Sequence, residues 1–356
     1  MFTKDSDLLI KYISNKVPEK TTLFKEYREL FDTFDKVSFE RKLNEVKSSS
    51  EEYTSITKIN DSFVSEDINE EIHKLNKFKQ LILLTNKSKI TINIHYSYED
   101  ITKFINIIVY AICFIFNLSI HNVYNCTINY YFTDNKKKLS LDKDYLNDYI
   151  TKNEVNSGSC SSDTINIWRK EEVLKVTLHE CIHLLNYDLK DEDNFLKEHY
   201  KKRYNITSEN MNIFEAYTEI WAELINIYLI VKLQKGNKHL FSKYIDYEIF
   251  FSTYQASKIF FITNLKDKPC DLNKETNVLP YFVIKCEFYN NLKGFLNHCK
   301  KEENNKNYVK IIKNFKKLIF KMSACGKNNK YFTKIDKKSY NYLTMRMSCL
   351  ELDLFA

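Results

Sequence analysis

Glycine and proline are the residues that this chain most lacks. Among 356 residues there are only 4 Gly and 3 Pro. Tight turns must therefore be made largely by Asn, Asp, Ser and Lys, and long helices with simple connections are favoured over a barrel of many strands. Hydrophobic residues at 44% and aromatic residues at 15% exclude a disordered chain, so we expect a folded protein with a sizeable core.

Arginine is also scarce, because only five Arg occur among the 54 basic residues. With abundant Asn, Ile, Tyr and Phe, the excess of lysine reflects the codon usage of an A+T-rich genome and says little about function. The net charge of +7 is small for this length, and the lysines are dispersed among acidic residues. Since no recognition motif is visible either, we expect no specific nucleic-acid binding.

The cysteines form no recognisable framework. There are nine, an odd number, and they are widely spaced without a CxxC pair. A disulfide scaffold and a structural zinc knuckle are therefore not expected. The first seven residues show no signal-peptide pattern, so we expect an intracellular, reducing compartment.

Long apolar runs are rare, and the longest candidate covers residues 104–120, which read FINIIVYAICFIFNLSI. A membrane span needs about 20 residues with few polar interruptions. This run is shorter and contains Asn106, Asn117 and Ser119. We expect this run to form a buried core helix without membrane contact. The alternative is a membrane helix.

The pattern of the chain changes twice along its length. Residues 1–85 place apolar side chains at helical spacing, which predicts a helical N-terminal region. Residues 86–235 contain alternating, β-branched segments at 89–98, 127–133 and 164–169, which predict strands. Residues 236–356 predict a helical C-terminal subdomain that completes a cleft. Helices are expected at 211–233, 241–262, 280–299 and 307–323, with a loop at 264–279, so the fold class is α+β and mostly helical.

The segment His179-Glu180-Cys181-Ile182-His183 is an HExxH motif within an apolar run. Residues four apart lie on one face of a helix, so both imidazoles can bind one metal ion with Glu180 beside it. With only 8 His in the chain, a chance match is roughly a one-in-a-hundred event. The predicted helix begins near residue 170 and continues through 185. The alternative is that both His form hydrogen bonds within a core.

A zinc site requires a third protein ligand, and residues 211–224 offer one. This segment reads MNIFEAYTEIWAEL and places Glu215 and Glu219 four residues apart in apolar surroundings. Two buried carboxylates on one helical face require a cation or hydrogen-bond donors. We expect Glu215 to be the third ligand, with His199, Glu219 and Glu223 as alternatives.

The sequence HECIH, followed 32 residues later by EAYTEIW, resembles the gluzincin class of zinc metallopeptidases. This resemblance implies a zincin-like core in which a small twisted sheet packs on the HExxH helix. It implies that Glu215 is the third zinc ligand and that Glu219 orients His179. Thr218 stands where the class usually has Ser, and Glu219 stands where it usually has Asp.

A second resemblance covers residues 90–350 and includes VNSGSC, INIWRKEEVLKVTLHECIH, ETNVLPYFVIKC and LTMRMS. These segments are similar to uncharacterised zincin-like proteins encoded by large DNA viruses. This resemblance implies a viral source, and hence the host cytoplasm or the virion as the location. It implies no particular reaction.

Together these features predict a zinc-dependent peptidase with one Zn²⁺ held by His179, His183 and Glu215. Glu180 is expected to act as general base toward a metal-bound water, on a peptide or protein substrate. The alternative is a noncatalytic zincin-fold protein that binds peptide or protein partners. A membrane-associated or nucleic-acid-associated structural protein has little support, and no oligomeric state is predicted.

Two features of the sequence predict residues that bind the substrate. The strand 164–169 resembles the edge strand that lies above the zinc in HExxH peptidases, so Ile165 and Ile167 are candidate substrate-binding residues. An ordinary sheet strand is the alternative. Arg346 is a candidate because arginine is rare here and can bind a carboxylate with two hydrogen bonds. Arg169 is expected to be structural and to bond Glu171 or Glu172.

Overall fold

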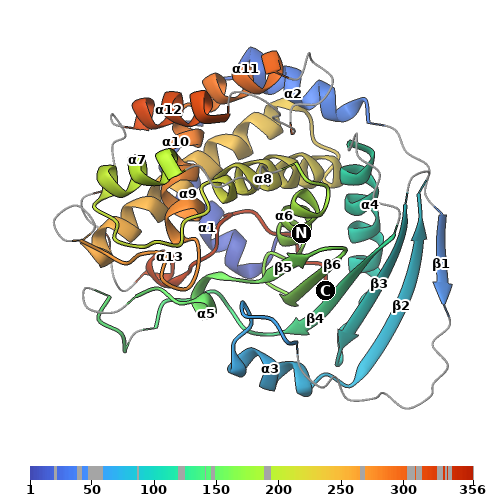
Figure 1. Cartoon of the computed structure of the whole chain (residues 1–356). Coiled ribbons are helices and arrows are strands. Elements are labelled where there is room, and N and C mark those ends of the chain that lie inside the picture. Colours follow the sequence, from blue (N-terminus) through green and yellow to red (C-terminus); the bar gives the residue numbers. More distant parts are fainter. Residues whose placement is uncertain are drawn as a thin grey trace.

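The computed structural model describes most of the chain, and every structural statement below refers to the residues that it describes. These are residues 1–19, 22–37, 42–46, 59–85, 88–118, 125–140, 142–145, 149–187, 194–264, 269–302, 309, 315–326, 332, 335 and 339–355. They form an α+β fold in which helices cover both faces of one mixed sheet (Figure 1). One hydrophobic core cluster includes residues from Leu9 to Leu354, so both ends of the chain contribute to the same core.

The sheet has six strands in the order β1-β2-β3-β4-β6-β5. The strands are β1 (Lys42–Val46), β2 (Lys77–Leu84), β3 (Lys89–Tyr96), β4 (Asn125–Thr133), β5 (Gly158–Ser161) and β6 (Thr164–Arg169). Neighbours β3, β4 and β6 are parallel, whereas the pairs β1–β2, β2–β3 and β5–β6 are antiparallel. The sheet therefore ends, next to the HExxH helix, in a short antiparallel edge strand.

The two faces of the sheet differ in polarity because side chains alternate along each strand. On β3, Ile90, Ile92 and Ile94 are fully buried against helices. Between them, Asn93 donates to Asn129 on β4, and Asn129 donates to Asn166 on β6, each over 2.9 Å. This amide ladder holds the parallel strands in register, because a slip of one residue would place amides in the core.

Four long helices stack on the apolar face of the sheet. They are α4 (Thr102–Leu118), α6 (Val173–Leu184), α8 (Phe214–Leu233) and α9 (Lys238–Thr263). Helix α6 packs on β5, β6, α4 and α8, and α8 packs in turn on α9 (Figure 1). Helix α6, which carries the motif, is therefore enclosed between the sheet and a second helical layer.

Residues 104–118 of the apolar run at 104–120 belong to the core helix α4, as predicted, and residues 119 and 120 lie outside the described residues. Ten residues of α4 are buried, and the helix packs against α6. Within the described part of the chain, no helix is both long enough and apolar enough for a membrane crossing.

The structure describes ten further helices. They are α1 (Lys4–Ser14), α2 (Lys25–Asp35), α3 (Glu66–His73), α5 (Lys152–Val155), α7 (Asn194–Tyr204), the π-helix η1 (Leu279–Ile284), α10 (Lys285–Asn290), α11 (Leu292–Glu302), α12 (Phe315–Gly326) and α13 (Tyr340–Leu343). Helices α1 and α2 pack against α9, while α3 lies near β4 on the opposite face of the sheet. There a second cluster joins Ile68 and Ile72 to Tyr131 and Trp168.

The chain ends in a buried extended segment, residues 344–355, which we call the C-terminal strap. It lies beside the N-terminus, where Thr3 N–H donates to the Glu351 carbonyl over 2.9 Å and Asp353 N–H donates to the Met1 carbonyl over 3.0 Å. The two termini are marked close together in Figure 1. The strap therefore ties the first and last residues of the chain into one unit.

The structure corrects two expectations about secondary structure. Residues 1–85 are not all helical, because β1 and β2 belong to the central sheet. The segment 77–84 reads KFKQLILL, and its four final apolar residues hide the alternation that would indicate a strand. The expected single helix at 280–299 is divided into η1, α10 and α11. Of the expected helix at 307–323, residues 307, 308 and 310–314 lie outside the described residues.

Candidate metal centre

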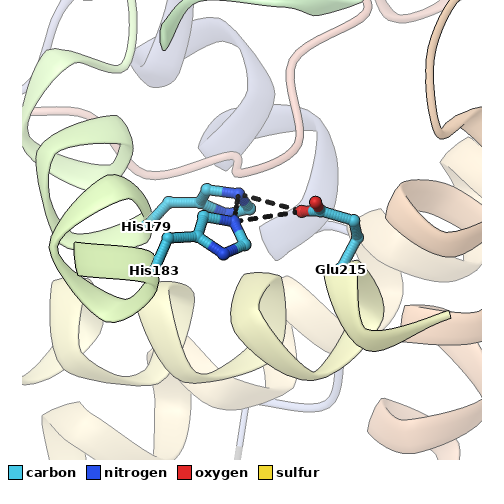
Figure 2. A group of neighbouring side chains, drawn as sticks. All are labelled: His179, His183 and Glu215. Carbon is cyan, nitrogen blue, oxygen red and sulfur yellow. Dashed lines mark hydrogen bonds and ion pairs between the residues drawn. The ribbon is translucent and has the colours of Figure 1, made fainter. Parts of the chain in front are cut away.

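Helix α6 positions the two histidines of the motif. Its apolar residues, including Leu178 and Ile182, are fully buried. His179 and His183 project together from the adjacent face toward α8, as four-residue spacing requires (Figure 2). His179 is buried and His183 is partly exposed, so the pair lies at the boundary between core and solvent.

Glu215, in the first turn of α8, completes a triad with these histidines (Figure 2). Its Oε2 atom lies 3.2 Å from Nε2 of His179 and 3.2 Å from Nε2 of His183. The two Nε2 atoms are 3.0 Å apart. All three ligand atoms can therefore face one metal ion.

Glu219, one turn further along α8, fixes the orientation of His179. Its Oε2 lies 2.7 Å from Nδ1 of His179. Because a carboxylate can only accept, Nδ1 carries the proton and Nε2 presents its lone pair toward Glu215. Burial alone would raise the pKa of Glu219, but the ammonium group of Lys175 and the hydrogen bond with His179 hold that pKa well below its usual value.

The chemistry of the triad suits a cation. Three acceptor atoms converge at one point, because Oε2 of Glu215 lies 3.2 Å from the Nε2 atom of each histidine. Without a metal ion, a proton must lie between Glu215 Oε2 and a histidine Nε2 atom. Accordingly, although burial opposes it, hydrogen bonds to Glu215 and Glu219 raise the pKa of His179. Tetrahedral zinc with ligands at about 2.0–2.1 Å would place ligand atoms roughly 3.3 Å apart, close to the distances in the triad.

Glu180 borders a small cavity beside the triad. The cavity measures about 30 Å³, and its walls include Lys137, Ser157, Gly158, Lys175, His179, Glu180, Tyr281 and Met347. Burial raises the pKa of the Glu180 carboxyl group. A Cβ atom at Gly158 would lie 2.8 Å from Val176 Cγ1 and 2.9 Å from Glu180 Oε1. Gly158 thus lets the edge strand β5 approach the motif closely.

The edge strand next to the motif helix is β5, and not the strand 164–169 that the sequence predicted. Strand β6 lies between β4 and β5, and its residues Ile165 and Ile167 are buried in the core. The expectation that these two side chains line a substrate site was wrong, because β5 occupies the edge. The sequence around β5, SGSCSSDT, consists mostly of small polar residues and indicates a loop by composition. It folds as a strand because Ser162, with a φ of 50°, closes a tight turn onto β6.

Arg346 also lies away from the cavity. Its guanidinium group is fully buried, donates to Ser6 Oγ over 2.9 Å and lies 3.2 Å from Glu351. It ties the strap to α1, so its proposed contact with substrate was wrong. Arg169 is structural as expected, but it donates to the backbone carbonyls of Asn156 and Asn153 rather than to Glu171 or Glu172.

The alternative third ligands are placed elsewhere. His199 lies 3.1 Å from Ser323 and packs edge-on against Phe320, on the helices α7 and α12. Glu223 pairs with Lys285. Glu219 faces Nδ1 of His179, on the far side of the imidazole from the triad. Of the four candidates, only Glu215 faces both Nε2 atoms.

Tyr281, which could not be selected among 25 tyrosines by spacing, is the residue that the sequence did not reveal. It lies on η1, with its ring 5.9 Å from the ring of His179 in an edge-on arrangement. Burial, reinforced by the charge of Glu215, raises the pKa of its hydroxyl group well above the usual value. The hydroxyl group therefore keeps its proton near neutral pH and can donate a hydrogen bond. A π-turn inside a helix often marks a functional position, but its presence was not readable from the sequence.

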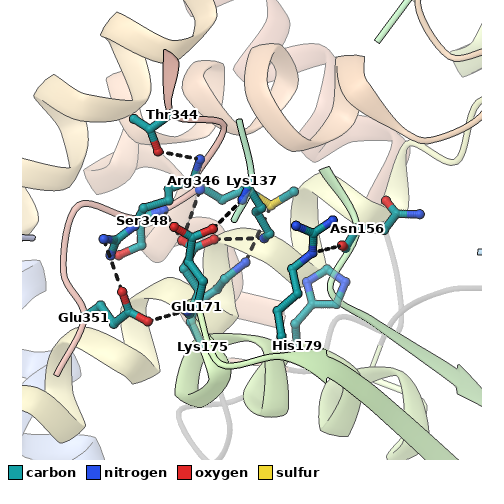
Figure 3. Close-up of polar contacts among 12 residues, drawn as sticks. Lys137, Asn156, Glu171, Lys175, His179, Thr344, Arg346, Ser348 and Glu351 are labelled. Carbon is teal, nitrogen blue, oxygen red and sulfur yellow. Dashed lines mark hydrogen bonds and ion pairs between the residues drawn. The ribbon is translucent and has the colours of Figure 1, made fainter. Parts of the chain in front are cut away.

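A buried network of charged side chains extends from the neighbourhood of His179 to the C-terminal strap (Figure 3). Lys175 Nζ lies 2.7 Å from Glu219 Oε1, and Lys137 Nζ lies 2.8 Å from Glu172 Oε2. The other oxygen of Glu172 accepts the N–H groups of Met347 and Ser348 in the strap, over 3.1 and 2.7 Å. The strap is thereby connected through Glu172 to the start of the motif helix.

Comparisons with known proteins give one partial similarity. No protein-family model and no solved structure matches the chain. The chain is 30% identical over 104 residues to the uncharacterised protein R210 of Acanthamoeba polyphaga mimivirus. This match covers 28% of the chain and 26% of that relative, so the chain spans about a quarter of the relative's length. The expected similarity to a viral protein is confirmed in this limited form, whereas membership of the zincins stays a prediction.

Proposed function

We propose that this protein is a zinc-dependent peptidase. The observation that carries the proposal is the convergence of His179, His183 and Glu215 beside Glu180, with ligand atoms 3.0–3.2 Å apart. Two neutral imidazoles, one carboxylate and one free position are the donor set of a catalytic zinc site. The resemblance of HECIH and EAYTEIW to the gluzincins agrees with this function.

The chain's own residues suit amide hydrolysis. Zinc held by the triad would supply a bound water of lowered pKa and would polarise the carbonyl of the substrate. Glu180 would accept a proton from that water and deliver it to the departing amine. Because burial raises the pKa of Glu180 above its usual value, this carboxyl group is suited to both steps. Tyr281 would donate its hydroxyl hydrogen to the developing oxyanion.

The edge strand β5 favours a peptide as substrate. An exposed sheet edge offers main-chain donors and acceptors, which an extended peptide can bind as an additional strand. Strand β5 runs directly beside the motif helix, because Gly158 leaves no side chain between them. A peptide added there would pass its backbone along the cavity that contains Glu180. This placement supports a peptide or protein substrate over a small ester.

The proposal is tested with the zinc-loaded full chain and a mixture of synthetic peptides analysed by mass spectrometry. We expect cleavage that a chelator abolishes and that added zinc restores. Zinc content of about one per chain is expected for the wild type, and Glu215→Ala should reduce it strongly. Absence of bound zinc would overturn the metal site. Bound zinc without cleavage of any peptide would instead support a noncatalytic protein that binds peptides.

A further inference from the structure

The cavity beside Glu180 is bordered by two buried lysines in addition to the groups that the proposed chemistry uses. Lys137 and Lys175 are 1% and 3% exposed, and both line the cavity. Lysine is almost never fully buried unless its charge is compensated. Glu172 compensates the charge of Lys137, and Glu219 compensates the charge of Lys175.

Both ammonium groups keep unused hydrogen-bond capacity. An ammonium group has three donors. In the described part of the chain, Nζ of Lys137 contacts one acceptor, Glu172 Oε2, over 2.8 Å. Nζ of Lys175 contacts Glu219 Oε1 over 2.7 Å and the thioether of Met347 over 3.5 Å, and a thioether is a weak acceptor. An acceptor in the cavity would complete both groups.

Ser157 supplies a third donor at the same cavity. Its side chain is 4% exposed, and its Oγ has no hydrogen-bond partner among the described residues. A buried hydroxyl without a partner is unfavourable, and native proteins rarely keep one. Ser157 directly precedes the edge strand and lines the cavity. Its free hydroxyl is thus a second, independent indication of an absent acceptor.

The donors that line the cavity favour an anion. Two ammonium groups and one hydroxyl group can donate to the same acceptor, and a carboxylate accepts charge-assisted hydrogen bonds through both of its oxygens.

We infer that this cavity is a subsite for a carboxylate group of the substrate, held by Lys137, Lys175 and Ser157. The volume agrees, because about 30 Å³ accommodates two water-sized groups at about 10–15 Å³ each, as in the two oxygens of a carboxylate. The inference rests on the proposed peptidase function. It predicts that the residue next to the cleaved bond is either acidic or carries the free C-terminal carboxylate.

Binding of small hydroxamates to the zinc-loaded chain tests the subsite without requiring turnover. The probes are the monohydroxamates of malonic, succinic and glutaric acid, each compared with its own primary amide by calorimetry. We expect at least one acid to bind about tenfold or more tightly than its amide, as a charge-assisted hydrogen bond predicts. Equal affinity within every pair would overturn the subsite and leave the metal centre intact. Failure of every probe to bind would overturn both proposals.

Variants assign the preference to individual residues. Ser157→Ala removes a hydroxyl without partners, so it should fold normally and reduce the preference for the acid about threefold or more. Lys137→Met should abolish the preference, whereas Lys138→Met, an exposed neighbour, should retain it. Retention of the full preference in both Ser157→Ala and Lys137→Met would contradict the assignment.

The source of the carboxylate is identified with matched peptides. One pair carries Glu or Gln next to the cleaved bond with both ends blocked, and a second pair has a free or an amidated C-terminus. A kcat/KM at least about tenfold higher for one of the two acids identifies the source and supports the subsite. Equal rates within both pairs would overturn it.

Discussion

Replacement of Glu219 by Gln tests how the metal centre is supported. Glu219 accepts from Nδ1 of His179 over 2.7 Å and lies 2.7 Å from Nζ of Lys175. Gln keeps the size of the side chain but removes the charge that fixes the His179 tautomer. Loss of such a partner typically weakens metal binding by about 10–100-fold, which corresponds to about 1.4–2.7 kcal/mol. We expect a loss of zinc affinity in this range.

The same substitution should reduce the stability of the zinc-free protein. Lys175 is 3% exposed, and its remaining contact would be the thioether of Met347. Removal of one partner from a buried ion pair typically costs about 3–5 kcal/mol of unfolding free energy. Zinc affinity is measured by competition with a chromophoric chelator, and stability is measured by denaturant unfolding without zinc.

Glu223→Gln is the matched control for this measurement. Glu223 lies one turn further along the same helix, is also buried, and pairs with Lys285 rather than with His179. The variant Glu223→Gln should be less stable than the wild type but should keep its zinc affinity within about threefold, because Glu223 does not touch a ligand. The reasoning is refuted if Glu219→Gln binds zinc as tightly as the wild type. An equal loss of affinity in Glu223→Gln would refute it as well.

Three further substitutions have separable outcomes. Gly158→Ala should lower kcat/KM at least about tenfold with unchanged zinc affinity, because its Cβ would lie 2.9 Å from Glu180 Oε1 and displace the base. Tyr281→Phe should lower kcat by about 100-fold with zinc still bound, and an unchanged kcat would exclude its role at the oxyanion. Glu172→Gln tests acid stability. Although burial opposes it, the charge of Lys137 lowers the pKa of Glu172 to about 2. The ionised Glu172 therefore contributes up to about 3 kcal/mol to the free energy of unfolding above about pH 4.3. This contribution is lost as the pH falls toward 2. The variant should lack this part of the acid dependence in denaturant unfolding at a series of pH values; an unchanged dependence would contradict the assignment.

The pairs of residues in the candidate metal site could be predicted from the sequence because their geometry is local. Residues four apart on a helix share one face, so the spacing of His179 and His183 fixed their relation before any tertiary structure was known. Glu215 and Glu219 followed from the same rule on a second apolar helix. The spacing could not predict how the two helices approach each other, because this depends on packing between His183 and Glu215, which are separated by 31 intervening residues.

The residues that line the cavity could not be predicted from the sequence, because they belong to segments with weak local patterns. Strand β5 consists of small polar residues and gains its strand conformation only from pairing with β6. Tyr281 points into the site from a π-turn, which has no sequence signature of its own. Lys137 and Lys175 resemble the many solvent-exposed lysines of the chain, and only tertiary burial distinguishes them. For Arg346 rarity was misleading, since its side chain bonds the strap to Ser6 and pairs with Glu351 within the strap.

The central claim is that Glu180 acts as the base of a zinc-dependent hydrolysis, and one comparison tests it most directly. Wild type and Glu180→Gln are prepared with equal zinc content, verified by elemental analysis, and given the same peptide mixture. We expect Glu180→Gln to retain about one zinc per chain and to lose at least about 100-fold in hydrolysis rate. Hydrolysis at the wild-type rate by the zinc-loaded variant would contradict it.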